Sequence, residues 1–266
     1  MHYLIHTLGK LAYLKIGQGE DFFLIFHGFG QTHQDMLVFD QIRKPGQTFL
    51  FIDMFYHGQS QWSESDKALD RSVWKELIEG LKKQEGLQTF HLIGYSMGGK
   101  FALLTFELFS VEVKSLMLIA PDGIKTGLWY SMNSYPNYIH TLFKRVVFKP
   151  NRFFGVVEGL QKAGLLEKSL VKFVKIQMET RSKRAQAYFV WKVFGGIQLN
   201  LGKIIQLFRK SQIPVFLFIG QFDKIVTEEN LARFSSKIPH LQKIILPVGH
   251  GSLIEAAANY LDSKKS

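Results

Sequence analysis

The sequence contains no cysteine and only 7 prolines among its 266 residues. Without cysteine, a disulfide framework, a thiolate metal site and a thiol nucleophile are all excluded. A chain that is 46% hydrophobic and carries 24 phenylalanines has the composition of a packed globular protein, not that of a disordered one. The length suits one large α/β domain or a domain with an insertion.

Long apolar runs are missing as well. No uncharged stretch approaches the roughly 18 residues that span a bilayer. The first residues, MHYLIHTLGKLAYLKIG, lack the basic start, apolar run and small-residue cleavage site of a secretory signal. The sequence therefore predicts a soluble, cytoplasmic protein.

Acidic residues are scarce in one part of the chain. Between His140 and Lys210 there are 15 Lys and Arg against 3 Asp and Glu, a balance of +12, while the whole chain carries +11. An electrostatic partner should therefore approach this segment. Lys168, Lys172 and Lys175 fall on one face of a predicted helix, and this stripe is either solvated or in contact with an anionic membrane. No nucleic-acid-binding motif accompanies it, so no nucleic-acid partner is expected.

Short apolar segments alternate with helix-length ones, which is the pattern of a mostly parallel sheet whose strands are connected through helices. Helices are expected at residues 72–83, 100–109 and 253–261. The interval from Asp122 to Gln212 is too long for a loop and predicts several helices inserted as a cap. Strands are expected at residues 2–8, 11–16, 22–27, 48–53, 89–94, 113–119, 214–219 and 243–247.

The segment HLIGYSMGGKF, residues 91–101, permits two interpretations. As G-x-x-x-x-G-K it resembles a phosphate-binding loop, but Phe101 stands where a Ser or Thr must ligate Mg²⁺. As G-x-S-x-G it makes Ser96 a nucleophile on a turn between a strand and a helix, where Gly94 and Gly98 let the two backbones approach. The flanking strand and helix patterns favour the second interpretation. Lys100 is expected to be solvated near the site.

A nucleophilic serine needs a base and a carboxylate that orients the base. His250, in VGHG after the last predicted strand, is the candidate base, because its flanking glycines permit a close approach. Asp223 follows the strand at 214–219 and is the preferred carboxylate. Asp122, at the end of the strand that follows Ser96, is the rival.

Acyl transfer also needs two donors for the oxyanion. The backbone N–H of Met97, directly after the nucleophile, is one candidate. The second is the N–H of Phe29 in the turn HGFG, which follows the strand at 22–27.

In this order and at these strand ends, HGFG, GYSMGG, GQFDKIV and GHG resemble the motifs of the α/β-hydrolase superfamily. The likeness covers a core of residues 1–123 and 211–266. Residues 124–210 fall where that family places a helical cap, between the sixth and seventh strands. DMFYHGQS, at residues 53–60, resembles the family loop D-x-P-G-x-G-x-S but has Phe-Tyr where Pro-Gly is common. The resemblance implies a serine hydrolase with a catalytic triad and an oxyanion hole.

We therefore expect an α/β-fold serine hydrolase of the carboxylesterase, lipase or thioesterase type, which cleaves a carboxylic ester or thioester with an apolar acyl group through an acyl-enzyme intermediate. No metal or organic cofactor is expected. Two alternatives remain: a non-catalytic or slow-turnover receptor or signalling protein, and a C–C bond hydrolase or perhydrolase that uses the same triad.

Phe29 and Tyr95 are expected to line the substrate pocket. Apolar and aromatic residues of the cap are candidates to join them. These are Trp129, Tyr130, Met132, Phe143, Phe153, Phe154, Phe173 and Trp191.

Overall fold

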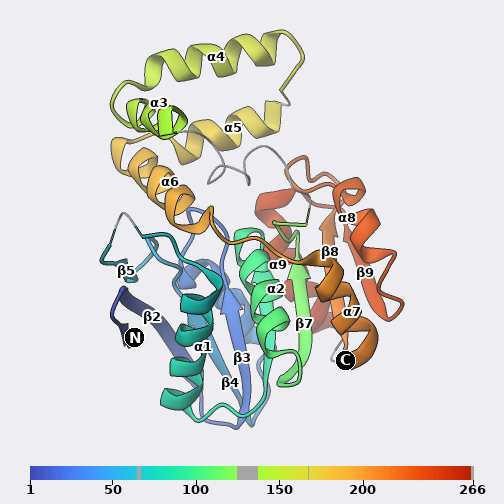
Figure 1. Ribbon diagram of the computed structural model, residues 1–266. Helices are drawn as coiled ribbons and strands as arrows, with labels where there is room; N and C mark the ends of the chain where they lie inside the picture. The colour runs from blue at the N-terminus through green and yellow to red at the C-terminus, as the bar shows by residue number, and fades with distance from the viewer. Residues whose placement is uncertain (65–66, 125–136, 167, 265–266) are drawn as a thin grey trace. The chain divides into compact units, whose positions relative to one another are not determined.

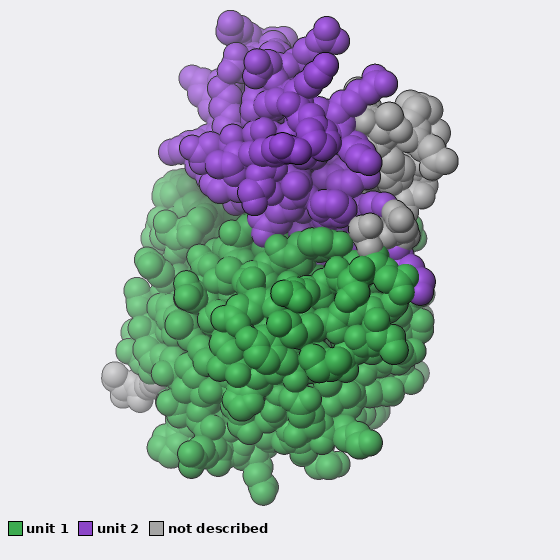
Figure 2. Space-filling model, turned by 90° about the vertical axis from the view of Figure 1, so that its left-hand side faces the viewer, with its two compact units in different colours: residues 1–64, 70–125, 197–266 green, residues 65–69, 126–196 purple. Residues whose placement is uncertain are grey.

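A computed structural model describes residues 1–64, 67–124, 137–166 and 168–264, with the backbone alone at 137–142 and 169–170 (Figure 1). Its internal contacts divide the chain into two compact units, which Figure 2 colours green and purple. Unit 1 comprises Met1–Glu64, Asp70–Lys125 and Ile197–Ser266, and unit 2 comprises Ser65–Leu69 and Thr126–Gly196.

Within the described residues, unit 1 is built on a nine-stranded sheet with the order β1-β2-β4-β3-β6-β7-β8-β9, in which β5 pairs with β2. The pairs from β4 to β9 are parallel, and the pairs that involve β2 are antiparallel. The strands are β1 His2–His6, β2 Gly9–Gly17, β3 Asp21–Phe26, β4 Gln47–Ile52, β5 Gln61–Trp62, β6 Phe90–Tyr95, β7 Val113–Ile119, β8 Val215–Gly220 and β9 Leu241–Leu246.

The predicted mostly parallel sheet is confirmed, and each predicted strand is present with ends shifted by at most two residues. Only β5 was not predicted, because two residues are too short to carry an alternating pattern. It pairs with Gly9 and Lys10 of β2. The predicted insertion lies between the strands labelled β7 and β8.

Helices cover both faces of the sheet (Figure 1). The helices α1 (Arg71–Glu85), α2 (Met97–Phe109) and α7 (Leu201–Ser211) lie on one face. The helix α9 (Leu253–Ser263) lies on the other, with the 3₁₀ segment η1 (His33–Ile42). A further helix, α8 (Glu228–Ser235), connects β8 to β9. Unit 1 therefore has helices, sheet and helices as three layers.

Local sequence explains where α1 begins and ends. Asp70 accepts a hydrogen bond from the Val73 N–H and caps the first turn, and Gly86 ends the helix with a φ of 74°. The apolar stripe of α1 is buried, and its Trp74 indole N–H donates to Thr105 Oγ1 of α2 at 2.9 Å. The Trp74 ring also packs against Phe101 of α2, with ring centroids 4.8 Å apart. The two helices therefore support each other on the sheet.

The boundary of unit 1 differs from the sequence prediction. We expected its second segment to begin at 211, whereas the contacts begin it at Ile197. The reason is α7, which packs on α2 through stacked rings of Phe106 and Phe208 with centroids 4.1 Å apart. The apolar stripe of α7 is buried in the core, so the helix belongs with the sheet.

Within its described residues, unit 2 consists of helices joined by short turns. Its helices are α3 (Asn137–Phe148), α4 (Pro150–Lys162), α5 (Lys168–Gln177) and α6 (Arg181–Phe194). The buried guanidinium of Arg184 donates to the carbonyl oxygens of Val147, Met178 and Glu179 and thereby ties α6 to the ends of α3 and α5. That unit 2 serves as a cap stays a prediction. Among the helices that the structure describes, none has the length and apolarity to cross a bilayer.

Candidate active site

Ser96 lies on the turn between β6 and α2, with a φ of 49° and a ψ of −116° that L-residues rarely adopt. Its N–H donates to the Ile119 carbonyl oxygen at 2.9 Å, and its own carbonyl oxygen accepts from the N–H groups of Gly99 and Asp122 at 2.9 Å each. The backbone is therefore held in this conformation from both sides. Such strain is typical of functional turns.

The two glycines of the motif are needed for steric reasons. A Cβ atom at Gly94 would collide with the carbonyl of Gly98, and a Cβ atom at Gly98 would collide with the carbonyl of Phe26 at the end of β3. The helix α2 can therefore start this close to the sheet only if both positions lack a side chain. The sequence analysis gave them the same role.

The structure brings Ser96, His250 and Asp223 together. His250 Nε2 lies 3.2 Å from Ser96 Oγ, and His250 Nδ1 lies 2.6 Å from Asp223 Oδ2. The other carboxylate oxygen of Asp223 accepts from the N–H groups of Ile225 and Val226 at 2.8 and 2.9 Å. Because Asp223 Oδ1 accepts those two N–H groups, its Oδ2 is directed at the imidazole, whose Nδ1 then carries the proton.

Asp122 has other partners. Its N–H donates to the Ser96 carbonyl oxygen, and its carboxylate accepts from the Gly123 N–H at 2.7 Å. Burial raises the pKa of Asp122 to about 6, although the Gly123 N–H and the charges of Lys100 and His250 lower it. The carboxylate that bonds the imidazole of His250 is therefore that of Asp223.

Lys100, which we expected to be solvated, is only 6% exposed. It stands on the first turn of α2, and a Cβ atom at Gly123 would meet its Cβ and Cγ atoms. Burial lowers the pKa of Lys100 to about 8, against the charge of Asp122, which raises it. The motif shows which residues the turn needs, but it does not show that the loop after β7 covers this lysine.

The turn HGFG directly follows β3 and is held on both sides of Phe29. The Gly28 N–H donates to Gln31 Oε1 and the Gly30 N–H donates to His57 Nε2, each at 3.0 Å. The Phe29 N–H, which we predict to bind the oxyanion, lies between these two anchored groups. The ring of Phe29 is half-buried, with its edge to the ring of His57 at 5.7 Å.

Two buried histidines connect this turn to the loop after β4. His27 Nδ1–H donates to the Gly28 carbonyl oxygen at 2.7 Å, and its Nε2 accepts from the Met54 N–H at 2.9 Å. His57 Nδ1–H donates to the Phe55 carbonyl oxygen at 3.0 Å, while its Nε2 accepts from Gly30. Each ring must therefore be neutral, with its proton on Nδ1.

The protonation of these rings follows from their burial. Burial, with the neighbouring His57, lowers the pKa of His27 to about 3, and burial lowers the pKa of His57 to about 4. Sequence analysis did not assign a role to either histidine. The signal was nonetheless available, because β3 and β4 were both predicted and each is followed by a His-Gly pair; parallel neighbouring strands bring the loops at their ends together.

Asp53 organises the rest of the loop after β4. Its buried carboxylate accepts from the N–H groups of His33 and Gln59 at 2.7 and 2.9 Å, and it lies 3.0 Å from the ring of His33. Tyr56, where the related loops often have glycine, adopts a φ of 64°. A tyrosine in this left-handed region is strained, so the loop makes this turn without the glycine that would relieve the strain.

Tyr95 is buried beside the site. Its hydroxyl donates to the carbonyl oxygen of His250 at 2.9 Å, and the two rings lie 5.1 Å apart. A Cβ atom at Gly28 would meet the Tyr95 ring, so this side chain fills the space between the HGFG turn and the loop of His250. That Tyr95 and Phe29 line a substrate pocket stays a prediction.

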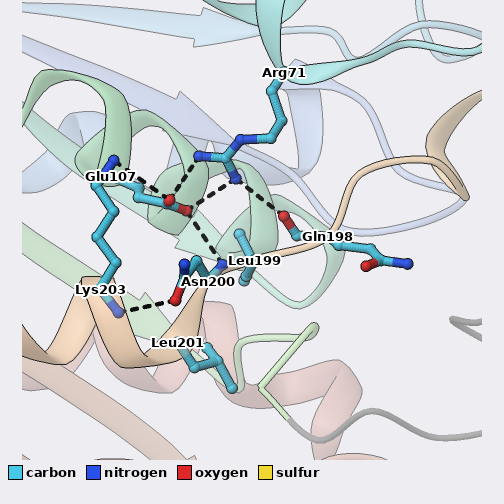
Figure 3. Close-up of a pocket in the computed structure, with 7 residues that line it drawn as sticks. All are labelled: Arg71, Glu107, Gln198, Leu199, Asn200, Leu201 and Lys203. Atoms are coloured by element: carbon cyan, nitrogen blue, oxygen red, sulfur yellow. Dashed lines mark hydrogen bonds and ion pairs between the residues drawn. The ribbon is translucent and has the colours of Figure 1, made fainter.

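A cavity lies elsewhere in unit 1, between α1, α2 and the start of α7 (Figure 3). The guanidinium of Arg71 points at the buried carboxylate of Glu107, and their closest atoms are 2.6 Å apart. Glu107 also accepts from the Asn200 N–H at 3.3 Å. These contacts fasten α7 to α1 and α2. The lining residues are Arg71, Glu107, Gln198, Leu199, Asn200, Leu201 and Lys203.

Some of the apolar and aromatic residues predicted for the pocket lie outside the described residues, and the others lie in unit 2, where Phe173 is half-buried on α5. Trp129, Tyr130 and Met132 lie outside the described residues. Phe143 and Trp191 pack against each other within unit 2, with ring centroids 4.6 Å apart, and Phe153 packs on Phe154. Within the described part of the chain, no group of three His, Asp or Glu side chains is arranged to hold a metal ion.

Comparison with known proteins gives the family. Among curated proteins, the chain is similar to "Lipase 1" of Psychrobacter immobilis, with 25% identity over 265 residues, 97% of this chain and 80% of the relative. It is also similar to "Putative esterase/lipase 2" of Mycoplasma genitalium, with 28% identity over 124 residues, 46% of this chain and 44% of the relative. The second match thus spans less than half of that protein.

A solved structure of a thermophilic esterase from Thermogutta terrifontis, with malate bound, has the same fold. Its TM-score is 0.67 at 18% identity, over 97% of this chain and 92% of that one. A family model described as the alpha/beta hydrolase fold matches residues 21–257. The protein therefore belongs to the alpha/beta hydrolase fold family.

Proposed function

We propose that the protein is a serine hydrolase that cleaves carboxylic esters or thioesters through an acyl-enzyme intermediate. The observation that carries the proposal is the pair of hydrogen bonds from Ser96 to His250 and from His250 to Asp223, at 3.2 and 2.6 Å. A serine on a strained turn at the start of a helix, beside an imidazole whose other nitrogen is bonded to a fixed carboxylate, is suited to nucleophilic attack. The relatives named esterase and lipase support ester hydrolysis as the class of reaction.

In the proposed reaction, Ser96 Oγ attacks the carbonyl carbon while His250 Nε2 takes the hydroxyl proton. Asp223 stabilises the imidazolium that forms. The proton then passes to the departing alcohol or thiol, which leaves Ser96 acylated. A water molecule, deprotonated by the same Nε2, attacks the acyl group and releases the carboxylic acid.

The N–H groups of Met97 and Phe29 would donate to the oxygen that becomes negative during each attack. Met97 is the first residue of α2, where the helix dipole also favours negative charge. Phe29 depends on the turn in which it lies. His27 and His57 are positioning residues in this proposal, because their hydrogen bonds hold that turn on both sides of Phe29.

The proposed substrate has an apolar acyl group. The half-buried ring of Phe29 lies beside the proposed oxyanion donors, and the relative that spans almost the whole chain is named as a lipase. Apolar side chains near the reacting carbonyl would exclude water from the acyl chain. A series of p-nitrophenyl esters of increasing acyl length, with matching thioesters, would define the preferred chain and leaving group.

A fluorophosphonate probe tests the proposal, because it reacts with an activated serine. We expect the intact protein to be labelled at Ser96 and the Ser96→Ala variant to remain unlabelled. Ser236→Ala, which removes an exposed hydroxyl of unit 1, is the matched control and should be labelled like the wild type. Equal labelling of Ser96→Ala, or no labelling of the wild type, would contradict the proposal and favour a non-catalytic binding protein.

A further inference from the structure

Exposed apolar side chains are concentrated in unit 2. Of the eleven large apolar residues that are strongly exposed in the described chain, five lie between α3 and α5. Leu165 is 71% exposed and Val156 62%, followed by Phe148, Ile176 and Leu160. Unit 2 holds less than a third of the chain. Apolar exposure is therefore not spread evenly, as it would be for isolated surface residues.

Much of this exposure belongs to the neighbouring helices α4 and α5. On α4, Arg152, Val156 and Leu160 recur every four residues and form one exposed stripe, while Val157 is buried. Lys168, Lys172 and Ile176 form a similar exposed stripe on α5, where Phe173 is half-buried. We name the α4–α5 surface after these two helices; it comprises Arg152, Val156, Leu160, Leu165, Lys168, Lys172 and Ile176.

An ion pair joins the two helices. Lys175 Nζ of α5 lies 2.6 Å from Glu158 Oε1 of α4, and both side chains are about half-exposed. Gly155 and Gly159, which carry no side chains, are also exposed on α4. The ion pair makes α4 and α5 neighbours within unit 2.

The charge of this part of the chain is unbalanced. In the described residues of α3 to α6 the acidic side chains are those of Glu158 and Glu179, and each forms an ion pair with a lysine, Lys175 or Lys183. Of the basic residues in excess, those from α3 to α5 are exposed, whereas Arg184 of α6 is buried. From α3 to α5 these are Lys144, Arg145, Lys149, Arg152, Lys162, Lys168 and Lys172.

A basic face that is simply solvated does not need large apolar side chains between its cations. Here Val156 and Leu160 follow Arg152, and Leu165 and Ile176 lie on either side of Lys168 and Lys172. Cations beside aliphatic residues on amphipathic helices match the interface of an anionic bilayer, where phosphates meet acyl chains. A nucleic acid would use the cations and leave the aliphatic residues exposed to water.

We propose that the α4–α5 surface docks on an anionic lipid bilayer. Arg152, Lys168 and Lys172 contact the lipid phosphates, while Val156 and Leu165 enter the boundary between headgroups and acyl chains. The contact is peripheral. It goes beyond the proposed hydrolysis and does not depend on it, because none of the residues involved belongs to the candidate active site.

Sedimentation of the full chain with lipid vesicles tests the docking. We expect binding to phosphatidylcholine vesicles that contain phosphatidylserine, loss of that binding at high salt, and little binding to pure phosphatidylcholine. The Ser96→Ala variant should bind as well as the wild type, which separates docking from catalysis. Absence of binding at low salt, or equal binding to neutral vesicles, would overturn the proposal.

Paired variants locate the surface. The double variant Lys168→Gln with Lys172→Gln should bind the vesicles more weakly, by about fivefold for each lysine. The control is the double variant Lys83→Gln with Lys237→Gln, which changes two exposed lysines of unit 1 and should leave binding unchanged. Val156→Ser with Leu165→Ser should weaken it about tenfold through lost apolar burial. Val111→Ser, at a residue 92% exposed in unit 1, is the control. Equal losses in a control and its partner would contradict the assignment.

Discussion

The two units differ in where they place polar and apolar side chains. Unit 1 buries polar side chains such as His27, Asp53 and His57, and each has hydrogen-bonding partners. Unit 2 exposes apolar side chains beside cations such as Lys168 and Lys172. Buried polar groups hold the surrounding loops in one conformation, because breaking any of their hydrogen bonds would leave an unpaired polar atom away from water. Clustered apolar side chains on a surface, by contrast, are typical of a site that binds another molecule. The order of the candidate active site therefore depends on specific contacts, whereas the proposed docking depends on the composition of the exposed surface.

The largest effect expected within unit 1 concerns the two candidate carboxylates. Asp223→Asn should lower kcat on a p-nitrophenyl ester about a thousandfold or more, because the amide no longer favours the Nδ1–H form of His250 or stabilises its cation. Asp122→Asn should change kcat less than tenfold. Full activity of Asp223→Asn, measured on the same ester, would show that another group orients the base.

The ion pairs of the two units should differ in strength. Arg71→Met leaves the buried carboxylate of Glu107, which is 2% exposed, without its main partner and should lower the free energy of unfolding by about 3 kcal/mol. Lys175→Met breaks the exposed pair with Glu158 in unit 2, where solvent screens both charges, and should leave the free energy of unfolding nearly unchanged. Denaturant unfolding of both variants measures the difference, and equal costs would remove this contrast.

Acid should destabilise unit 1 through its neutral histidines. The folded pKa values of His27 and His57, about 3 and about 4, lie below the ordinary 6.5, so the unfolded chain binds more protons as the pH falls from 6.5. The free energy of unfolding then decreases, by about 2 kcal/mol per histidine between pH 6.5 and 5. In the His57→Gln variant, the free energy of unfolding should decrease less over this pH range than in the wild type. The same decrease in both proteins would contradict a neutral, buried His57.

A smaller effect should distinguish positioning from stability. His57→Phe keeps a ring but removes the acceptor of the Gly30 N–H, so the turn that carries Phe29 loses one anchor; kcat should fall about tenfold with little change in KM. His57→Gln, whose amide oxygen can accept that bond, should recover part of the loss. His2→Gln, at an exposed histidine of β1, is the control. A rise in KM alone would instead place His57 in substrate binding.

The sequence was most informative where local sterics decide the structure. A strand, G-x-S-x-G and a helix fit one sharp turn, so the place of Ser96 could be predicted, and His250 and Asp223 follow strands that a parallel sheet brings to the same edge. The structure brings these three side chains together, while their catalytic roles stay a prediction. Asp122 was a rival for the same reason, because it too follows a strand of that edge.

What the sequence did not indicate depends on contacts between distant segments. His27 and His57 act on each other's loops only because β3 and β4 are neighbours. The burial of Lys100 depends on the loop after β7, and the place of α7 depends on how Phe208 meets Phe106. Each of these features depends on the packing of distant segments, which a local hydrophobic pattern does not predict.

A serine at the start of a helix usually bonds its hydroxyl to the first free N–H groups, and Ser96 makes no such bond. The start of α2 therefore gains no capping hydrogen bond from this hydroxyl, which instead lies 3.2 Å from His250 Nε2. It follows that alanine at this position should leave the melting temperature nearly unchanged. The Ser96→Ala variant should then be suitable for measuring substrate binding without hydrolysis of the substrate.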